Sequence, residues 1–234
     1  HPTKYSMEEK ISRSEILIEK TGHAITPIKI SQKISGFGDS YSDAIKEITN
    51  NSKILDSDGK VFIKCASRIL SNFKMTRGGP FHENLDETLR RCWDAIGINL
   101  LEINRAVRTS NLLRDRYLLE LSAQEREVLI AKIWLLTKKL LPFTMGKTSY
   151  GLVGASKILF SVLPEIVLPV DNTEWLSVFQ TVDLGDVLRW MVLDIQKWEE
   201  ITGSQLNVLD QSKRLTTLPS VYNVMAMDAR PKDL

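Results

Sequence analysis

Apolar side chains recur at helical intervals along most of this 234-residue chain. Phe62, Ala66, Ile69 and Phe73, for example, follow one another every three or four residues, which is the spacing of one helix face. Similar spacing predicts further helices over residues 42–50, 84–107, 123–140, 152–163, 173–179 and 184–201. Alternation of period two, which would indicate strands, is scarce. We therefore predict an all-α fold with at most a small extended segment near the N-terminus, within residues 25–34.

The strongest interruption of this helical pattern is Arg77-Gly78-Gly79-Pro80, because glycine and proline are the residues that most often end helices. It predicts two helical lobes with a cleft between them. The first would be an N-terminal helical and irregular lobe over residues 1–76. The second, over residues 77–234, would be helical and would contain a helix-hairpin-helix-like element.

Composition limits the class of protein without identifying it. A hydrophobic fraction of 43%, a charged fraction of 26% and a net charge of +2 are ordinary for a globular domain. Cys65 and Cys92 are isolated and the three histidines lie far apart, so we expect no metal site and no other cofactor. Isolated cysteines also suit a reducing compartment, which predicts a cytoplasmic protein. No apolar run reaches the ~18 residues of a membrane span, so no membrane partner is expected.

Positive charge gathers in one part of the chain. Between Val128 and Pro164 there is no carboxylate, and the segment carries Lys132, Lys138, Lys139, Lys147 and Lys157. A hairpin-like segment, residues 149–154, lies between two predicted helices of this region. Glycines at the start of the second helix would let a phosphate approach unpaired backbone N–H groups. We predict a DNA-binding surface made of Lys138, Lys139, Lys147, Tyr150, Gly151 and Gly154; the alternative is that these glycines serve only the turn and packing.

The helix predicted after this hairpin has two different sides. Leu152, Leu159 and Leu163 share one face of it, whereas Gly154 and Lys157 lie on the other. The apolar face should therefore pack on the preceding helix or its neighbours.

Asp171 is the candidate catalytic residue. Asp171-Asn172-Thr173-Glu174 has the spacing of a helix N-cap, with an acceptor at the cap and a glutamate three residues later. This capping role is compatible with catalysis, because a cap holds an ionised aspartate in place.

The residues around this aspartate resemble those of a known family. Gly-Leu-Val-Gly-Ala-Ser-Lys-Ile-Leu-Phe at 151–160, followed by Leu-Pro-Val-Asp-Asn at 168–172, is similar to the helix-hairpin-helix DNA glycosylases. The resemblance covers about residues 120–200. It implies that the hairpin binds a DNA phosphate and that Asp171 serves in base excision. Two features depart from the family: Gly151 and Gly154 are three apart rather than two, and Val153 stands where strand-cleaving members carry a lysine.

The resemblance implies a DNA-binding protein of glycosylase-like fold. If the protein is an enzyme, it would be a monofunctional N-glycosylase that removes a modified base, with Tyr150 and Trp175 as walls of the base pocket. Asp171 would then stabilise positive charge on the sugar or orient the attacking water. The alternative is a non-catalytic all-helical interaction protein in which the hairpin is only a packing motif. The two differ in whether Asp171 faces a solvent-reachable cleft or is sealed against the backbone at Thr173 and Glu174.

Overall fold

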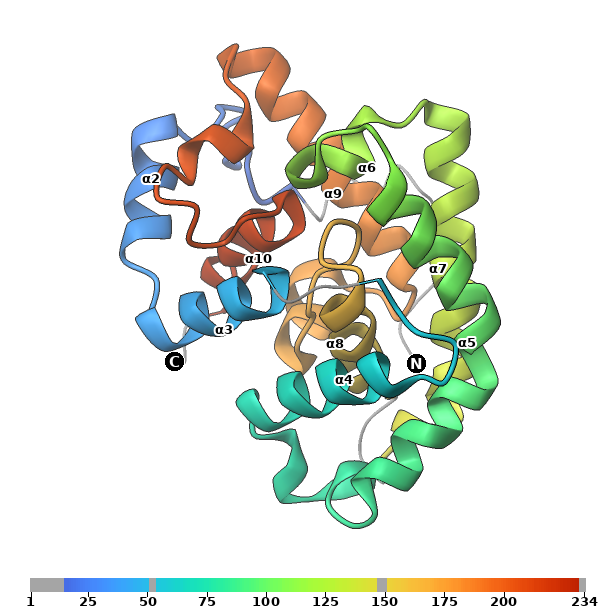
Figure 1. Cartoon of the computed structure of the whole chain (residues 1–234). Coiled ribbons are helices and arrows are strands. Elements are labelled where there is room, and N and C mark those ends of the chain that lie inside the picture. Colours follow the sequence, from blue (N-terminus) through green and yellow to red (C-terminus); the bar gives the residue numbers. More distant parts are fainter. Residues whose placement is uncertain (1–14, 51–53, 147–150, 232–234) are drawn as a thin grey trace.

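The computed structural model describes residues 15–50, 54–146 and 151–231 of the chain, and over these residues the fold is all-α (Figure 1). Extended pairing among them is limited to one isolated antiparallel bridge between Ile18 and Ala24. The longer helices are α2 (Pro27–Ser35), α3 (Asp39–Asn50), α4 (Lys60–Asn72), α5 (Leu85–Thr109), α7 (Ala123–Thr144), α8 (Leu152–Val162), α9 (Leu184–Thr202) and α10 (Leu218–Asp228). Shorter helical segments are η1 (Met75–Arg77), η2 (Gly79–Phe81), η3 (Arg114–Arg116), α6 (Tyr117–Glu120), η4 (Glu174–Phe179) and η5 (Leu206–Leu209).

The centre of the molecule is α8, which lies between α4 and α7 (Figure 1). Every residue of α8 except Val153 is buried, including Gly154 and Lys157. The sequence pattern predicted that this helix packs on a neighbouring helix through its apolar face only. The structure supplies a second, because α4 covers the side that carries Lys157. Polar groups on α8 are therefore enclosed, and their hydrogen-bond partners must come from the protein itself.

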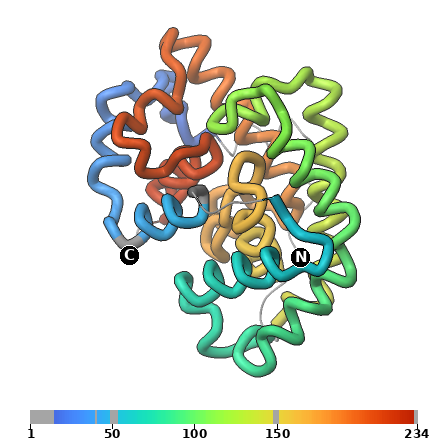
Figure 2. Tube along the Cα trace, viewed as in Figure 1, coloured from blue at the N-terminus to red at the C-terminus, as the bar shows by residue number. Residues whose placement is uncertain are grey.

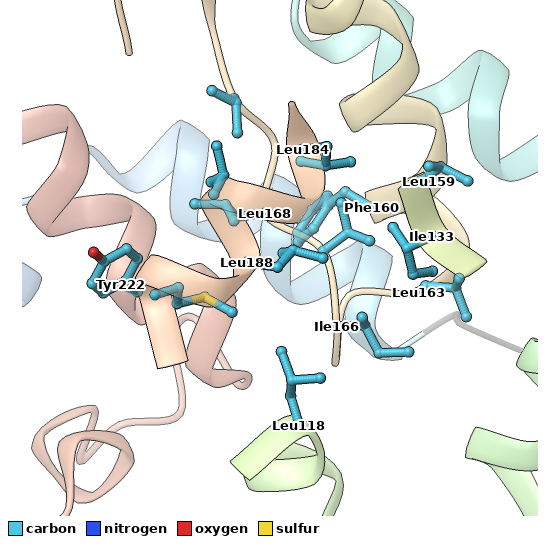
Figure 3. Close-up of a cluster of buried hydrophobic side chains, with 14 of the residues drawn as sticks. Leu118, Ile133, Leu159, Phe160, Leu163, Ile166, Leu168, Leu184, Leu188 and Tyr222 are labelled. Atoms are coloured by element: carbon cyan, nitrogen blue, oxygen red, sulfur yellow. The ribbon is translucent and has the colours of Figure 1, made fainter. Parts of the chain in front are cut away.

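Apolar side chains from several helices hold α8 in this position (Figure 3). Leu159, Phe160 and Leu163 belong to the same hydrophobic cluster as Leu184 and Leu188 of α9, and all five are fully buried. Burial of each large apolar side chain contributes on the order of 1.5–3 kcal/mol relative to exposure. The central helix is thus fixed firmly enough to serve as a platform for the side chains it carries.

Segments from the two ends of the described chain lie side by side (Figure 2). Helix α2 packs on α10 and on η5. Lys33 of α2 also pairs with Asp228 of α10, with 2.9 Å between nitrogen and oxygen. One hydrophobic core includes residues from both sides of the turn at Arg77–Pro80. The position predicted as a lobe boundary is therefore a turn across which helices of both segments pack together.

Local capping residues set several helix ends. Ser122 and Glu125 form both hydrogen bonds of a capping box at the start of α7. The stretch 25–34, for which at most a small extended segment was predicted, is occupied mostly by α2. Thr26 caps that helix by accepting the N–H of Lys29, and Pro27 takes the first helical position, where a missing N–H costs nothing. No helix of the described residues is long and apolar enough to cross a membrane.

Candidate functional site

The site begins with Ser156 on α8, which fixes the backbone just before Asp171. The Ser156 hydroxyl accepts the N–H of Val170 at 3.1 Å and lies 3.3 Å from the Val170 carbonyl oxygen. Ser156 is itself fully buried on the central helix. The residue before Asp171 is therefore hydrogen-bonded directly to the buried central helix.

Asp171 is both a helix cap and a solvent-reachable carboxylate. Its Oδ1 accepts the N–H of Glu174 at 3.0 Å, while its own N–H donates to Glu174 Oε1 at 3.4 Å, so the predicted capping box is formed. Its Oδ2 accepts a hydrogen bond from Arg230, with 2.9 Å between the atoms. The Asp171 side chain remains 29% exposed. It is therefore not sealed, although both of its oxygens have partners within the protein.

Glu174 lies one turn after Asp171 in a very different environment. It is 1% exposed. Its Oε2 is buried and has no hydrogen-bond partner among the described residues. Burial raises the pKa of Glu174 well above its usual value, and the negative charge of Asp171 raises it further. The environment of this side chain therefore favours the protonated carboxyl.

Lys157 of α8 adds a buried amine to the same cluster. The side chain is 7% exposed, and its Nζ lies 4.7 Å from the centroid of the Phe73 ring. None of the described residues accepts a hydrogen bond from this ammonium group. Burial lowers the pKa of Lys157, while the charges of Asp171 and Glu174 act in the opposite direction.

A row of three aromatic rings borders the cluster. Phe37 and Tyr41 have centroids 4.7 Å apart, Tyr41 and Phe73 are 5.7 Å apart, and both pairs meet edge to face. The Tyr41 ring is partly exposed, but its hydroxyl points inward and accepts the Asn223 side-chain N–H at 2.7 Å. Burial of this hydroxyl raises the pKa of Tyr41, and the nearby Glu174 contributes in the same direction.

Surface cavities lie at both ends of the aromatic row. One of about 420 Å³ is lined by Phe37 and Arg230 among others, and one of about 450 Å³ is lined by Tyr41 and Phe73. Asn223, whose Oδ1 is buried and unpaired among the described residues, lies behind Tyr41. A planar molecule in the second cavity would meet the rings of Tyr41 and Phe73, whereas Asp171 and Glu174 do not line this cavity.

The hairpin glycines serve close packing in this structure. Gly151 precedes α8 with a φ of 76°, a conformation that favours glycine, and no side chain caps the helix there. Its carbonyl accepts the Thr144 hydroxyl at 2.8 Å. A Cβ on Gly154 would lie 2.9 Å from the Phe81 ring. These contacts support the packing role; phosphate binding by the same residues stays a prediction.

Beside these glycines lies a cavity of about 650 Å³. Its walls are Met75, Gly78–Phe81, Thr144–Gly146, Val153 and Gly154. Much of this lining is glycine, which leaves backbone accessible. Gly154 and Lys157 are three residues apart on one side of α8, facing Phe81 and Phe73 respectively. Helix α8 therefore contributes residues both to the cavity beside the hairpin glycines and to the cluster around Asp171.

The remaining predicted residues have varied placements. Lys138 and Lys139 are exposed on α7, and Lys138 Nζ lies 5.8 Å from the centroid of the Trp134 ring. Lys147 and Tyr150 lie outside the described residues. Trp175 is buried in the core, because η4 turns it inward, so it is not the wall of an open pocket in this structure.

Sequence reasoning missed most partners of Asp171. Glu174 was noted only as a capping residue, and Lys157 only as one of several basic residues. Tyr41, Asn223 and Arg230 carried no signal, since they are brought to the site from distant helices. A single lysine in an otherwise uncharged helix was the one local indication that could have singled out Lys157.

Within the described part of the chain, no three His, Cys, Asp or Glu side chains are placed to share a metal ion. Comparisons with protein-family models, with curated proteins and with solved structures find no match for this chain. The site must therefore be interpreted from its own geometry.

Proposed function

We propose that this chain is a DNA-binding protein of the helix-hairpin-helix glycosylase type, and that it removes a modified base at Asp171. One observation carries the proposal: Lys157 and Glu174 are both buried beside Asp171, and Glu174 Oε2 has no hydrogen-bond partner among the described residues. Burial of such groups is costly, and groups of this kind gather at functional sites.

The DNA-binding part of the proposal rests on the start of α8. The first N–H groups of a helix have no partner within it, and at α8 no side-chain cap bond is present at Gly151, the first described residue of this segment. Together with the helix dipole they favour an anion, and the adjacent glycine-lined cavity gives access to the backbone. Lys138 and Lys139, exposed on the preceding helix, would contact neighbouring phosphates.

The chemical part rests on how Asp171 is held. The Glu174 N–H and the Arg230 guanidinium donate hydrogen bonds to its two oxygens and so fix the orientation of the carboxylate. A fixed negative charge would stabilise the positive charge that develops on the sugar as the base departs. Tyr41 and Phe73 would supply aromatic surface for the extruded base. Val153, partly buried beside the hairpin cavity, supplies no amine, so the reaction would be hydrolytic.

Single-turnover excision on a panel of duplexes with modified bases tests the chemistry. Asp171→Asn should abolish excision while the melting temperature changes little, because asparagine caps helices about as well as aspartate and an exposed ion pair contributes at most about 1 kcal/mol. The matched control is Asp183→Asn, which alters another N-cap aspartate, at the start of α9. Its excision rate should equal that of the wild type. Full excision activity in Asp171→Asn would mean that Asp171 is only a structural cap.

Salt titration of duplex binding tests the DNA-binding surface. Each lysine–phosphate contact contributes a slope of about 0.9 in the logarithm of affinity against the logarithm of salt concentration. The double change Lys138→Gln and Lys139→Gln should therefore lower the slope by up to about 2. Lys20→Gln, an exposed lysine in the turn before Ala24, is the control. Absence of binding at low salt, or no salt dependence, would contradict the proposal.

The competing function is a non-catalytic helical interaction protein. The observation in its favour is that Glu174 and Arg230 occupy both oxygens of Asp171, as in a purely structural cap. It predicts a folded wild type that neither binds duplex DNA nor excises any base. The two assays above therefore separate the two functions.

A further inference from the structure

The surface formed by α5 and α7 leaves large apolar side chains in contact with water. The two helices pack against each other (Figure 1). On their outer side, Ile98 of α5 is 86% exposed, and Val128 and Leu135 of α7 are 51% and 52% exposed. Ala131, which lies between the two α7 residues on the same face of that helix, is exposed as well. Single exposed apolar residues need no explanation, but a contiguous group of them marks a site of interaction.

An ion pair between Glu102 and Lys132 shows how these residues lie relative to one another. Its oxygen and nitrogen are 3.7 Å apart, and it joins the middle of α5 to the middle of α7. The helices run in opposite directions, because residues after Glu102 on α5 share a cavity with residues before Lys132 on α7. Ile98 lies one turn before Glu102 and Leu135 lies one turn after Lys132. Both apolar side chains are therefore on the same side of the ion pair.

On the other side of the ion pair lies the cavity that the two helices share, an apolar groove of about 380 Å³. Ile103 and Ala106 of α5 line it together with Leu121, Val128 and Leu129. The outer face of α5 and α7 thus has exposed apolar side chains at one end and an apolar hollow at the other, with the ion pair between them.

Charge is divided along the same face. Lys138 and Lys139 are exposed beyond Leu135, in a stretch of α7 that contains no carboxylate. Glu125, at the opposite end of α7, is exposed at the edge of the groove. The acid and the two lysines are 13 and 14 residues apart, or about 20 Å along the helix, so they cannot pair within one chain.

We propose that this face binds a second copy of the same chain, through a two-fold axis that crosses α5 and α7 at the ion pair. Such an axis places each helix antiparallel on the same helix of the other copy. Ile98 and Leu135 of each copy then enter the groove of the other. Lys138 and Lys139 reach Glu125 of the second copy. The face is complementary to itself in shape and in charge, which favours a second copy over an unrelated protein.

The size of the face is sufficient for a dimer. Helices α5 and α7 have 25 and 22 residues, so at a rise of 1.5 Å per residue they share a length of about 33 Å. Two helices side by side, each about 10 Å across, make the face roughly 20 Å wide. It offers on the order of 650 Å² per copy, or about 1,300 Å² in a dimer, which lies within the range of about 1,200–2,000 Å² for stable interfaces.

The dimer does not rest on the proposed function, because self-association is measured without DNA. The two are connected through Lys138 and Lys139, which belong both to the proposed DNA-binding surface and to the edge of this face. A duplex and a second copy would therefore compete for these lysines. Failure of DNA binding leaves the dimer intact, and absence of a dimer leaves the lysines available to DNA.

Sedimentation velocity of the full chain measures the association. From about 1 to about 200 µM the wild type should change from monomer to dimer, since interfaces near this size have dissociation constants in the micromolar range or below. Ile98→Glu should raise the dissociation constant at least about tenfold, because each dimer would bury two unpaired carboxylates. Its melting temperature should not change, as Ile98 is almost fully exposed in the single chain. Ile28→Glu, at a 72% exposed position of α2, is the matched control and should dimerise like the wild type.

A charge exchange tests the antiparallel arrangement. Lys138→Glu with Lys139→Glu places acids opposite Glu125 of the second copy, whereas Glu125→Lys places an amine opposite the two lysines. Each variant alone should dimerise more weakly than the wild type. An equimolar mixture should form heterodimers, because every acid then meets an amine.

A wild type that stays monomeric over the whole concentration range overturns the proposal and leaves the face to a different partner. A dimer that Ile98→Glu does not weaken also overturns it, because the contact must then lie elsewhere. If the mixture of charge variants does not restore association, the antiparallel arrangement is wrong.

Discussion

Asp194 of α9 provides a quantitative test of how this protein buries charge. Its Oδ2 accepts the N–H groups of Ile16 and Leu17 at 3.0 and 3.2 Å and the hydroxyl of Tyr222 at 3.0 Å. These bonds fasten the first described residues to α9 and α10. The side chain is 4% exposed, and its Oδ1 has no partner among the described residues. Burial raises the pKa of Asp194 to about 6, although the three hydrogen bonds act to lower it.

The sign of the resulting pH dependence follows from this shift. The folded protein holds the Asp194 proton more tightly than the unfolded chain, whose pKa is near 3.8. The stabilisation is therefore fully present below pH 3.8 and is lost as pH rises through 6. A difference of 2.2 pKa units corresponds to about 3 kcal/mol in the free energy of unfolding. About 2 kcal/mol of this falls between pH 4.5 and pH 7.

Urea unfolding of the wild type and of Asp194→Asn across pH 4.5 to 7.5 measures this effect. Asparagine keeps an acceptor for the same three donors but does not titrate. The wild-type free energy of unfolding, minus that of the variant, should fall by about 2 kcal/mol from pH 4.5 to 7. Asp228→Asn, which alters a half-exposed aspartate paired with Lys33, should give a much smaller change.

A difference that rises with pH would refute the reasoning about Asp194, because it would mean that the hydrogen bonds outweigh burial. A flat difference would show that the two effects cancel. Tyr222→Phe gives a further check. It removes one hydrogen bond to the carboxylate, so it should move the pH dependence to higher pH.

Two further substitutions test buried charge elsewhere. Glu165 is fully enclosed and accepts hydrogen bonds from Arg108 at 2.6 Å and from Arg114 at 2.9 Å. Glu165→Ala should lower the free energy of unfolding, measured by urea titration, by about 3–5 kcal/mol, because Arg108 is then left buried without its carboxylate partner. A loss below 1 kcal/mol would mean that water replaces the carboxylate. Lys157→Met should raise the free energy of unfolding by about 1–2 kcal/mol while it weakens excision, since methionine fills the space without a buried charge. A destabilised Lys157→Met would show that the ammonium has favourable interactions that exceed its cost of burial.

Local sequence patterns predicted the long helices well. The segments predicted over residues 84–107 and 123–140 are α5 and α7, and each begins within one residue of its predicted start. Helix α5 has one apolar face and one polar face, so its periodicity is clear, whereas the start of α7 is marked by the capping box of Ser122 and Glu125. Helix α10 was missed because it is buried nearly all round and thus lacks a polar face. The burial of α8 was missed for a related reason: its second packing partner, α4, comes from a distant part of the sequence.

The candidate site divides in the same way between local and distant contacts. The capping box of Asp171 and Glu174 spans three residues, so spacing alone predicts it. Arg230 lies 59 residues after Asp171, and Tyr41 lies 130 residues before it, and only the packing of α2, α3 and α10 brings them together. Trp175 shows the opposite error. The family resemblance implied that it would be a pocket wall, but the turn of η4 directs it into the core.

The energetic contributions of these residues distinguish a structural site from a functional one. The Asp171–Arg230 pair is partly exposed and contributes no more than about 1 kcal/mol, which a structural cap fully explains. Lys157 and Glu174 are different, because apolar residues of similar size would fill their places at lower free energy. A helix at the centre of the core that retains a lysine with no hydrogen-bonded acceptor among the described residues therefore sacrifices stability at that position. Perturbed, buried ionisable groups gather at functional sites, and they also occur in structural ion-pair networks, so burial by itself does not separate the two roles. The cap accounts for Asp171 alone. The burial of Lys157 and Glu174 needs a second reason, and the stability of Lys157→Met together with the excision rate of Asp171→Asn decides whether that reason is functional.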